Sequence, residues 1–146
     1  MSTSRKVLCA FYALVALAAF WGTWSENVAY FASPGRAGAM FLFDLKANPG
    51  TRSISIDLTL FLLAAATWMI LEARRIGVRF VAAYIVGAFA IAISVTFPLF
   101  LIARELRLAK VNGQGKRDTP PTATDAVGIV LLIAISAALV WYLHAR

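Results

Sequence analysis

The stretch SISIDLTLFLLAAATWMILEARRIGVR, from Ser53 to Arg79, decides the fold class of this chain. Its centre is an apolar run long enough to cross the hydrocarbon core of a bilayer as an α-helix. Asp57 lies near the start of the run, and Glu72 lies near its end with three arginines behind it. Basic residues at the ends of apolar runs are typical of membrane proteins. The stretch therefore predicts a membrane-spanning helix.

The composition of the whole chain agrees with lipid as its solvent. Of the 146 residues 61% are hydrophobic and 14% are charged, and the mean hydropathy is +0.78, whereas soluble domains carry roughly 25% charged residues. A soluble domain of this size could not bury so much apolar surface. The net charge of +7 comes from basic residues at the ends of apolar runs. It therefore indicates membrane interfaces and does not indicate a nucleic acid partner.

Three further apolar runs predict an all-α, polytopic membrane protein with four transmembrane helices in a bundle. The predicted spans are residues 7–24, 55–73, 80–103 and 126–143. We expect the second span to begin near Ser53 or Ser55, because either hydroxyl could serve as the N-cap. Pro98 lies inside the third span and predicts a kink, because proline removes a backbone hydrogen bond.

The connections between the spans differ in character. Residues 38–47 form an apolar patch that is too short to cross a bilayer, so we expect a short interfacial or re-entrant helix after the first span. Residues 109–124 contain several glycines and prolines and predict a flexible, hydrated loop. The chain is therefore expected to form a single membrane domain over residues 1–146.

Motifs for known chemistry are missing from the sequence. Cys9 is the one cysteine and His144 the one histidine, so no disulfide, CxxC pair or bis-histidine haem site can be built within the chain. The sequence contains no HExxH, GxSxG or phosphate-binding glycine loop. The middles of the four apolar runs carry no ionisable residue, although coupled transporters usually place one there. We therefore predict no catalytic residue, no metal and no cofactor.

Two groups of polar residues are the candidate sites. Asp57 and Glu72 are about 22 Å apart along a helix, so they cannot act as a catalytic pair. If the second and third spans are antiparallel, the first group, a polar interfacial cluster, gathers Asp44, Asn48, Asp57, Arg104 and Glu105. The second group, a basic interfacial anchor, contains Glu72, Arg74, Arg75 and Arg79.

Each group has a structural and a functional interpretation. The structural interpretation is helix capping, snorkelling and salt bridging at the membrane interface. The functional interpretation makes the polar interfacial cluster a site for a lipid headgroup or ligand. Its walls would be Trp24, Phe41, Phe43 and Phe100.

The orientation in the membrane is nearly balanced by charge. With the N-terminus inside, four spans place six Lys and Arg residues in the cytoplasm and eight on the other side. We nevertheless favour the N-terminus inside, because the first helix often dominates orientation and the second connection holds three arginines in a short loop.

Four short segments carry a resemblance to a known family. They are Asn48-Pro49, Asp57, EARR at residues 72–75 and PLFLIARE at residues 98–105. In combination they resemble DUF2834, a family of small bacterial membrane proteins of unknown function, over roughly residues 7–108. The resemblance implies a three-helix unit whose usual motif reads Glu-Gly-Arg-Arg, so Ala73 replaces a glycine here and the fourth span is an addition. It implies a membrane location and no established activity.

The function that these observations favour is a non-enzymatic accessory protein, or a protein that binds lipid or an apolar small molecule, in the bacterial cytoplasmic membrane. The expected partners are the lipid bilayer and either a membrane-protein partner or further copies of the chain. A small oligomeric transporter or channel is the alternative, and a membrane enzyme acting on a lipid-like substrate is the third hypothesis. Whether a reaction is catalysed stays open, and the missing motifs favour a non-enzyme.

Overall fold

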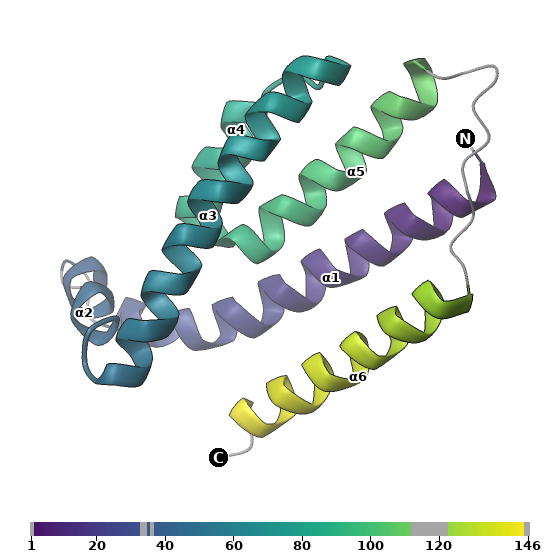
Figure 1. Ribbon diagram of the computed structural model, residues 1–146. Coiled ribbons are helices and arrows are strands. Elements are labelled where there is room, and N and C mark those ends of the chain that lie inside the picture. The colour runs from purple at the N-terminus through teal and green to yellow at the C-terminus, as the bar shows by residue number, and fades with distance from the viewer. Residues whose placement is uncertain (1, 33–34, 36, 112–122, 145–146) are drawn as a thin grey trace. The chain divides into compact units, whose positions relative to one another are not determined.

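The computed structural model describes residues 2–32, 35, 37–111 and 123–144, and no strand occurs among them (Figure 1). The chain divides into two compact units, Met1–Gln114 and Gly115–Arg146, which are described separately. The helices of the first unit are α1 (Thr3–Asn27), η1 (Val28–Ala32), α2 (Ala37–Asp44), α3 (Pro49–Ile76), α4 (Val81–Gly87), η2 (Ala88–Ala92) and α5 (Ile93–Val111). The second unit contains α6 (Ala123–His144).

Helix α3 begins earlier than the sequence interpretation placed it. Asn48 is the N-cap, and Pro49 occupies the first turn, where its missing N–H costs nothing. The Asn48 side chain accepts a hydrogen bond from the Thr51 backbone N–H at 2.9 Å, and the Thr51 hydroxyl accepts one from the Asn48 N–H at 3.2 Å. Ser55 instead donates to the Thr51 carbonyl at 2.7 Å. The predicted start near residues 53–55 is therefore wrong.

A glycine ends α3 and lets the chain reverse. Gly77 has a φ of 73°, a left-handed conformation that glycine adopts without a steric penalty. Its N–H donates to the Ala73 carbonyl at 2.8 Å. Phe80, with a φ of 60°, precedes the first residue of α4. The connection between α3 and α4 is therefore a tight turn.

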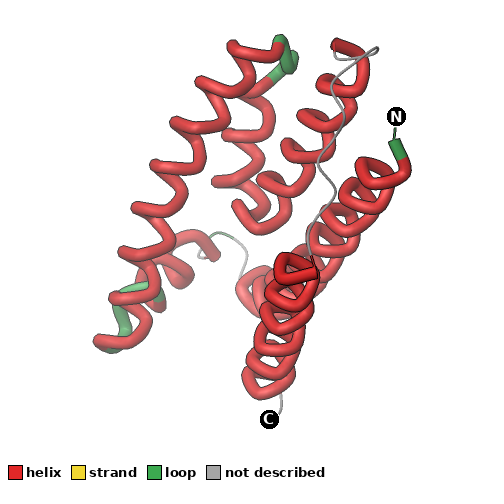
Figure 2. Tube along the Cα trace, turned by 45° about the vertical axis from the view of Figure 1, so that its right-hand side comes forward, coloured by secondary structure: helices red, strands yellow, loops and turns green. Residues whose placement is uncertain are grey.

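The third apolar run does not form one straight span. The ring centroids of Tyr84 and Phe100 lie 5.7 Å apart, although sixteen residues of straight helix would separate them by about 24 Å. A Cβ atom added at Gly87 would lie 2.9 Å from Cγ2 of Thr96. The chain therefore folds back at η2, and α4 and α5 form the two arms of a helical hairpin (Figure 2).

This hairpin corrects the prediction of a single kinked span over residues 80–103. Pro98 lies inside α5 and is buried, and the reversal occurs earlier, in a π-helical turn at Ala88–Ala92. Three of the five residues of that turn are alanines, and Gly87 precedes it. Small side chains allow helices to approach closely, and they allow the two arms to meet near the turn.

Because the hairpin reverses the chain, α5 runs parallel to α3. Residue numbers increase in the same order on both helices along the series of contacts. The pairs are Phe61 with Phe97, Trp68 with Phe100, and Glu72 with Arg104. Helix α1 packs against α5 in the opposite direction, so that Arg5 lies near Glu105. The start of α1 and the ends of α3 and α5 therefore share one end of the unit, here called the network end. The opposite end, with α2 and the start of α3, is called the α2 end.

The small core of the first unit lies between α3 and the hairpin. Met69 and Phe100 are fully buried, and Ala73 packs with them. A second group, Ala65 with Ala88 and Ile93, packs at the tip of the hairpin. Most of the other large apolar side chains are exposed. Such an outward-facing apolar surface is typical of a protein whose solvent is lipid.

Three described helical stretches are long and apolar enough to cross a membrane by length and composition: Thr3–Phe31, Pro49–Ile76 and Val81–Val111. The third of these is the stretch that folds back. In α6, the apolar part Ala126–Tyr142 is shorter. The all-helical, membrane-compatible class is confirmed, and the predicted count of four spans stays a prediction.

The connection after α1 contains the short helix expected at residues 38–47, because α2 covers Ala37–Asp44. The Tyr30 hydroxyl donates to Oδ2 of Asp44 at 2.8 Å, and the Tyr30 ring packs edge-on against Phe41. Its interfacial or re-entrant position stays a prediction. Of the predicted flexible loop 109–124, residues 112–122 lie outside the described residues.

Gly87→Ala should destabilise the hairpin, because the added methyl group would overlap the Thr96 methyl group. We expect a loss of about 1–3 kcal/mol in unfolding free energy. Thr96→Ser in the same chain should recover most of this loss, because serine keeps the hydroxyl that donates to the Ala92 carbonyl and lacks the methyl group. The measurement is SDS-induced unfolding in mixed micelles.

Gly22→Ala in α1 is the matched control, since a Cβ atom there meets nothing within 4 Å. Its effect should be neutral or slightly stabilising. Equal effects of Gly87→Ala and Gly22→Ala would contradict the close approach of the two arms.

Candidate functional site

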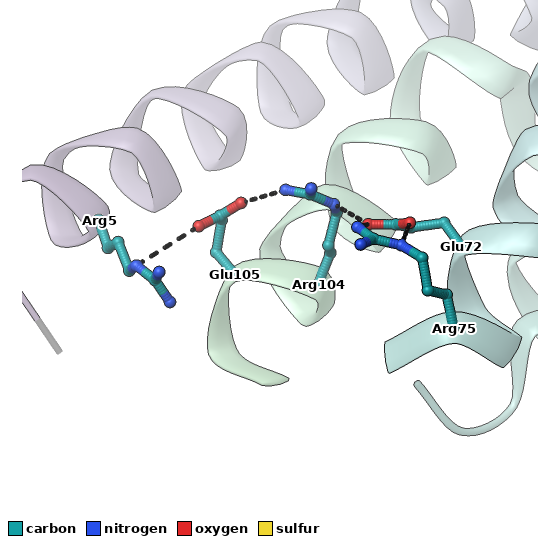
Figure 3. A network of polar contacts seen from close by, with 5 residues as sticks. All are labelled: Arg5, Glu72, Arg75, Arg104 and Glu105. Carbon is teal, nitrogen blue, oxygen red and sulfur yellow. Dashed lines mark hydrogen bonds and ion pairs between the residues drawn. The ribbon is translucent and has the colours of Figure 1, made fainter. Parts of the chain in front are cut away.

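Two buried carboxylates, Glu72 and Glu105, lie at the network end, each with a relative exposure of 6%. Both belong to a continuous series of ion pairs that connects three helices. Figure 3 shows the series, which runs through Arg5, Glu105, Arg104, Glu72 and Arg75. This group is called the ion network below.

Glu72 is held by arginines from its own helix and from α5. Arg75 lies three residues further along α3 and donates from Nε to Oε2 at 2.6 Å and from Nη2 to Oε1 at 2.8 Å. Arg104 donates from Nε to Oε1 of Glu72 at 2.7 Å. Bidentate guanidinium–carboxylate pairs of this kind are strong and directional. Glu72 thus fixes the end of α3 against α5.

Arg104 continues the ion network toward α1. Its Nη1 donates to Oε1 of Glu105 at 2.6 Å, and its guanidinium lies 6.0 Å from the centroid of the Trp68 ring. Oε2 of Glu105 lies 3.9 Å from Nε of Arg5 on α1. The link to α1 is therefore the longest in the network.

The ion network holds three helices together. A buried carboxylate without a partner is costly, and here both carboxylates have guanidinium partners. Arginine stays protonated in proteins, so none of the three arginines can exchange a proton with a substrate. Within the described part of the chain, no group of three or more His, Cys, Asp or Glu residues could hold a metal ion. The network therefore provides rigidity at this end of the unit.

The structure separates the residues of the predicted polar interfacial cluster. Arg104 and Glu105 lie with Glu72 in the ion network, which is about 22 Å along α3 from Asp57. The grouping of Asp57 with these two residues is therefore wrong. Its cause is the hairpin, because an antiparallel third span would have brought Arg104 to the start of α3.

The other members of that cluster have local roles at the α2 end. Asp44 accepts the hydrogen bond from Tyr30, and Asn48 caps α3. Asp57 is exposed on the third turn of α3. Phe100, which was expected to wall a site there, is buried in the core beside Met69. No shared site forms from these residues.

The predicted basic anchor is partly included in the ion network. Glu72 and Arg75 are paired, whereas Arg74 and Arg79 are exposed near the turn after α3. Its anchoring role stays a prediction. Sequence reasoning missed Arg5, because nothing in a charged N-terminal segment indicates that one arginine packs against a helix a hundred residues later.

Exposed cations surround the ion network at the surface. This set is called the basic rim and consists of Lys6, Arg74, Arg79, Arg107 and Lys110. Arg107 also donates from Nε to the Ile76 carbonyl at 3.1 Å and so caps the C-terminal end of α3. Among the described residues, the network end holds eight cationic side chains against two carboxylates, and the α2 end holds two against three. The unit is therefore strongly polarised in charge.

Glu72→Gln should destabilise the first unit, because it removes the carboxylate that compensates Arg104 and Arg75. We expect a loss of about 3 kcal/mol in unfolding free energy, as found when one partner of a buried pair is removed. SDS-induced unfolding in mixed micelles measures it. Asp57→Asn is the control and should change the free energy by less than about 0.5 kcal/mol, because Asp57 is exposed. A wild-type unfolding midpoint for Glu72→Gln would show that the ion network does not stabilise the fold.

Comparison with known proteins identifies the family. The family model described as "Protein of unknown function DUF2834" matches residues 11–106. No curated protein and no solved structure matches the chain. Two of the segments that carry the resemblance, EARR at residues 72–75 and the end of PLFLIARE at residues 103–105, meet in the ion network. The chain belongs to the DUF2834 family.

Proposed function

We propose that this chain is a non-enzymatic binding protein of the bacterial cytoplasmic membrane, which holds lipid or a partner membrane protein. One observation carries the proposal. At the network end both carboxylates are buried and occupied by arginines, while the five cations of the basic rim are exposed. Such an end is suited to binding anionic groups, and its two described carboxylates are already occupied by arginines.

The charge asymmetry supports an orientation with the N-terminus in the cytoplasm. Four straight spans would place Arg104, Arg107 and Lys110 on the side opposite Arg5. The hairpin instead brings them to the end that holds Arg5, so that the described Lys and Arg residues divide eight to two in favour of this end. Cytoplasmic loops carry the excess of Lys and Arg in membrane proteins. The hairpin is then re-entrant from the cytoplasmic side.

The hairpin also favours a second candidate function, a small oligomeric channel or transporter. Its tip packs at Ala65, which is close to the middle of α3. Non-straight helices that end at membrane depth occur where they are buried in protein or line a water-filled pathway. Further copies of the chain would have to complete such a pathway.

Native mass spectrometry of the gently extracted protein tests the proposed function. A stoichiometric membrane-protein partner or retained lipid is the expected result. Symmetric oligomers that carry ions or solutes across liposome membranes would instead support the second candidate function, a channel or transporter. Protein that retains neither lipid nor a partner, and that shows no flux, would contradict both.

Cysteine labelling tests the orientation and the re-entrant hairpin together. Arg79→Cys, Lys110→Cys and Lys46→Cys are introduced singly with Cys9→Ser. With a membrane-impermeant maleimide, we expect positions 79 and 110 to react from the cytoplasmic face, in inverted vesicles, and position 46 to react from the outside, in spheroplasts. Reaction of positions 110 and 46 from the same face would show instead that the third apolar run crosses the membrane.

A further inference from the structure

We propose that the turn between α3 and α4 binds the phosphate of an anionic phospholipid through Arg79, Arg107 and Lys110. This inference rests on the proposed function, since it names the lipid class and the site. The turn lies at the network end and joins α3 to α4, the first arm of the hairpin. Its residues include Gly77, which has no side chain to fill the space beside the backbone.

Arg107 is positioned against this turn by the neighbouring helix. Its Nε donates to the Ile76 carbonyl at 3.1 Å, and its Nη2 lies 3.1 Å from the place of a Cβ atom at Gly77. A guanidinium carries five N–H donors in a planar fork. The bond to Ile76 uses one of them and fixes the side chain, while the two Nη groups remain for phosphate oxygens, which arginine binds in a bidentate manner.

Arg79 adds charge in the same turn, and Lys110 adds charge on the same helix as Arg107. Arg79 is two residues beyond Gly77 in the same turn, and Lys110 follows Arg107 by three residues on α5, so that it lies on the same face of the helix. Both side chains belong to exposed residues. The described carboxylates of this end, Glu72 and Glu105, are buried in the ion network, so neither of these two competes with a bound phosphate.

Phe80 makes a lipid the better occupant than free phosphate. Its side chain is 78% exposed, and the Arg79 guanidinium lies 5.8 Å from the centroid of its ring. A cation thus adjoins an exposed apolar surface. A phospholipid presents the matching pair, a phosphate next to acyl chains, whereas inorganic phosphate would use the charges alone.

Lipid retention by the full-length protein tests the site. The protein is purified in detergent and mixed with equal amounts of phosphatidylglycerol and phosphatidylcholine, and the bound lipid is measured by native mass spectrometry. Wild type should retain phosphatidylglycerol preferentially. Arg79→Gln and Lys110→Gln should each reduce that retention about fivefold, the effect of one cation near an anionic lipid surface, and should leave phosphatidylcholine unchanged.

Two further variants sharpen the assignment. Arg107→Lys keeps the charge and loses the planar fork, so we expect retention between that of wild type and that of Arg79→Gln. Arg52→Gln is the control at the α2 end, where Arg52 donates to the Lys46 carbonyl, and it should behave as wild type. Equal unfolding midpoints of Arg79→Gln, Lys110→Gln and wild type verify that folding is intact.

The outcomes separate the site from the proposed function. Wild-type retention of phosphatidylglycerol in both Arg79→Gln and Lys110→Gln would overturn the site and leave the proposed function standing. Displacement of the lipid by equimolar inorganic phosphate would overturn lipid as the occupant. Equal retention of both lipids by wild type would overturn the preference for anionic lipid, and a wild-type protein that retains no lipid and no partner would contradict the proposed function itself.

Discussion

The close approach of Gly87 to Thr96 is the constraint on which the rest of the first unit depends. A Cβ atom at Gly87 would stand only 2.9 Å from the Thr96 methyl group, so the missing side chain at this position lets the two arms of the hairpin approach without displacing Thr96. The hairpin reverses the chain within one apolar run and makes α5 parallel to α3. Arg104 reaches Glu72 for that reason. The link between Glu72 and Arg104, and the place of Arg107 and Lys110 in the basic rim, are consequences of this reversal.

The buried apolar clusters of the first unit lie where the hairpin meets α3, and α1 packs along α5. Between helices in lipid there is little hydrophobic driving force, so association relies on close contact and on polar links. Met69 and Phe100 supply the close contact at the centre of this interface, and Glu72 with Arg104 supplies the polar link at its end. The exposed apolar side chains elsewhere cost little in a bilayer, which explains how so small a core can suffice.

Local features of the fold could be predicted from the sequence, but the reversal could not. Apolar runs gave the helical membrane class, and the apolar patch at residues 38–47, which is too short to cross a bilayer, predicted a separate short helix, which is α2. Asn48-Pro49 is a recognisable start of a helix. The sequence interpretation nevertheless placed the start at Ser53 or Ser55. The run from Val81 to Val111 has the composition of one long span. Hydropathy measures only how apolar the run is, so it cannot show that the chain reverses within it.

The candidate site was missed for the same reason. Pairing by antiparallel neighbours placed Arg104 with Asp57, which was a sound rule applied to a run that folds back on itself. The signals in favour of a hairpin were weak ones, namely Gly87, the alanines that follow it and a run longer than a bilayer requires. Small residues at such spacing are equally typical of straight helices that pack together. Sequence alone therefore could not decide which carboxylate Arg104 would meet.

The arginines at the network end divide into two roles according to whether a carboxylate pairs with them. The side chain of Arg104 is 25% exposed and that of Arg75 is 66% exposed, although both bind the same carboxylate. Long cationic side chains that start within an apolar segment extend toward water. Here Glu72 pairs with two of them, Arg75 and Arg104. Arg107 instead donates to the backbone carbonyl at the end of α3. Because Glu72 and Glu105 pair with Arg5, Arg75 and Arg104, the exposed cations of the basic rim keep their charge available for the proposed phospholipid.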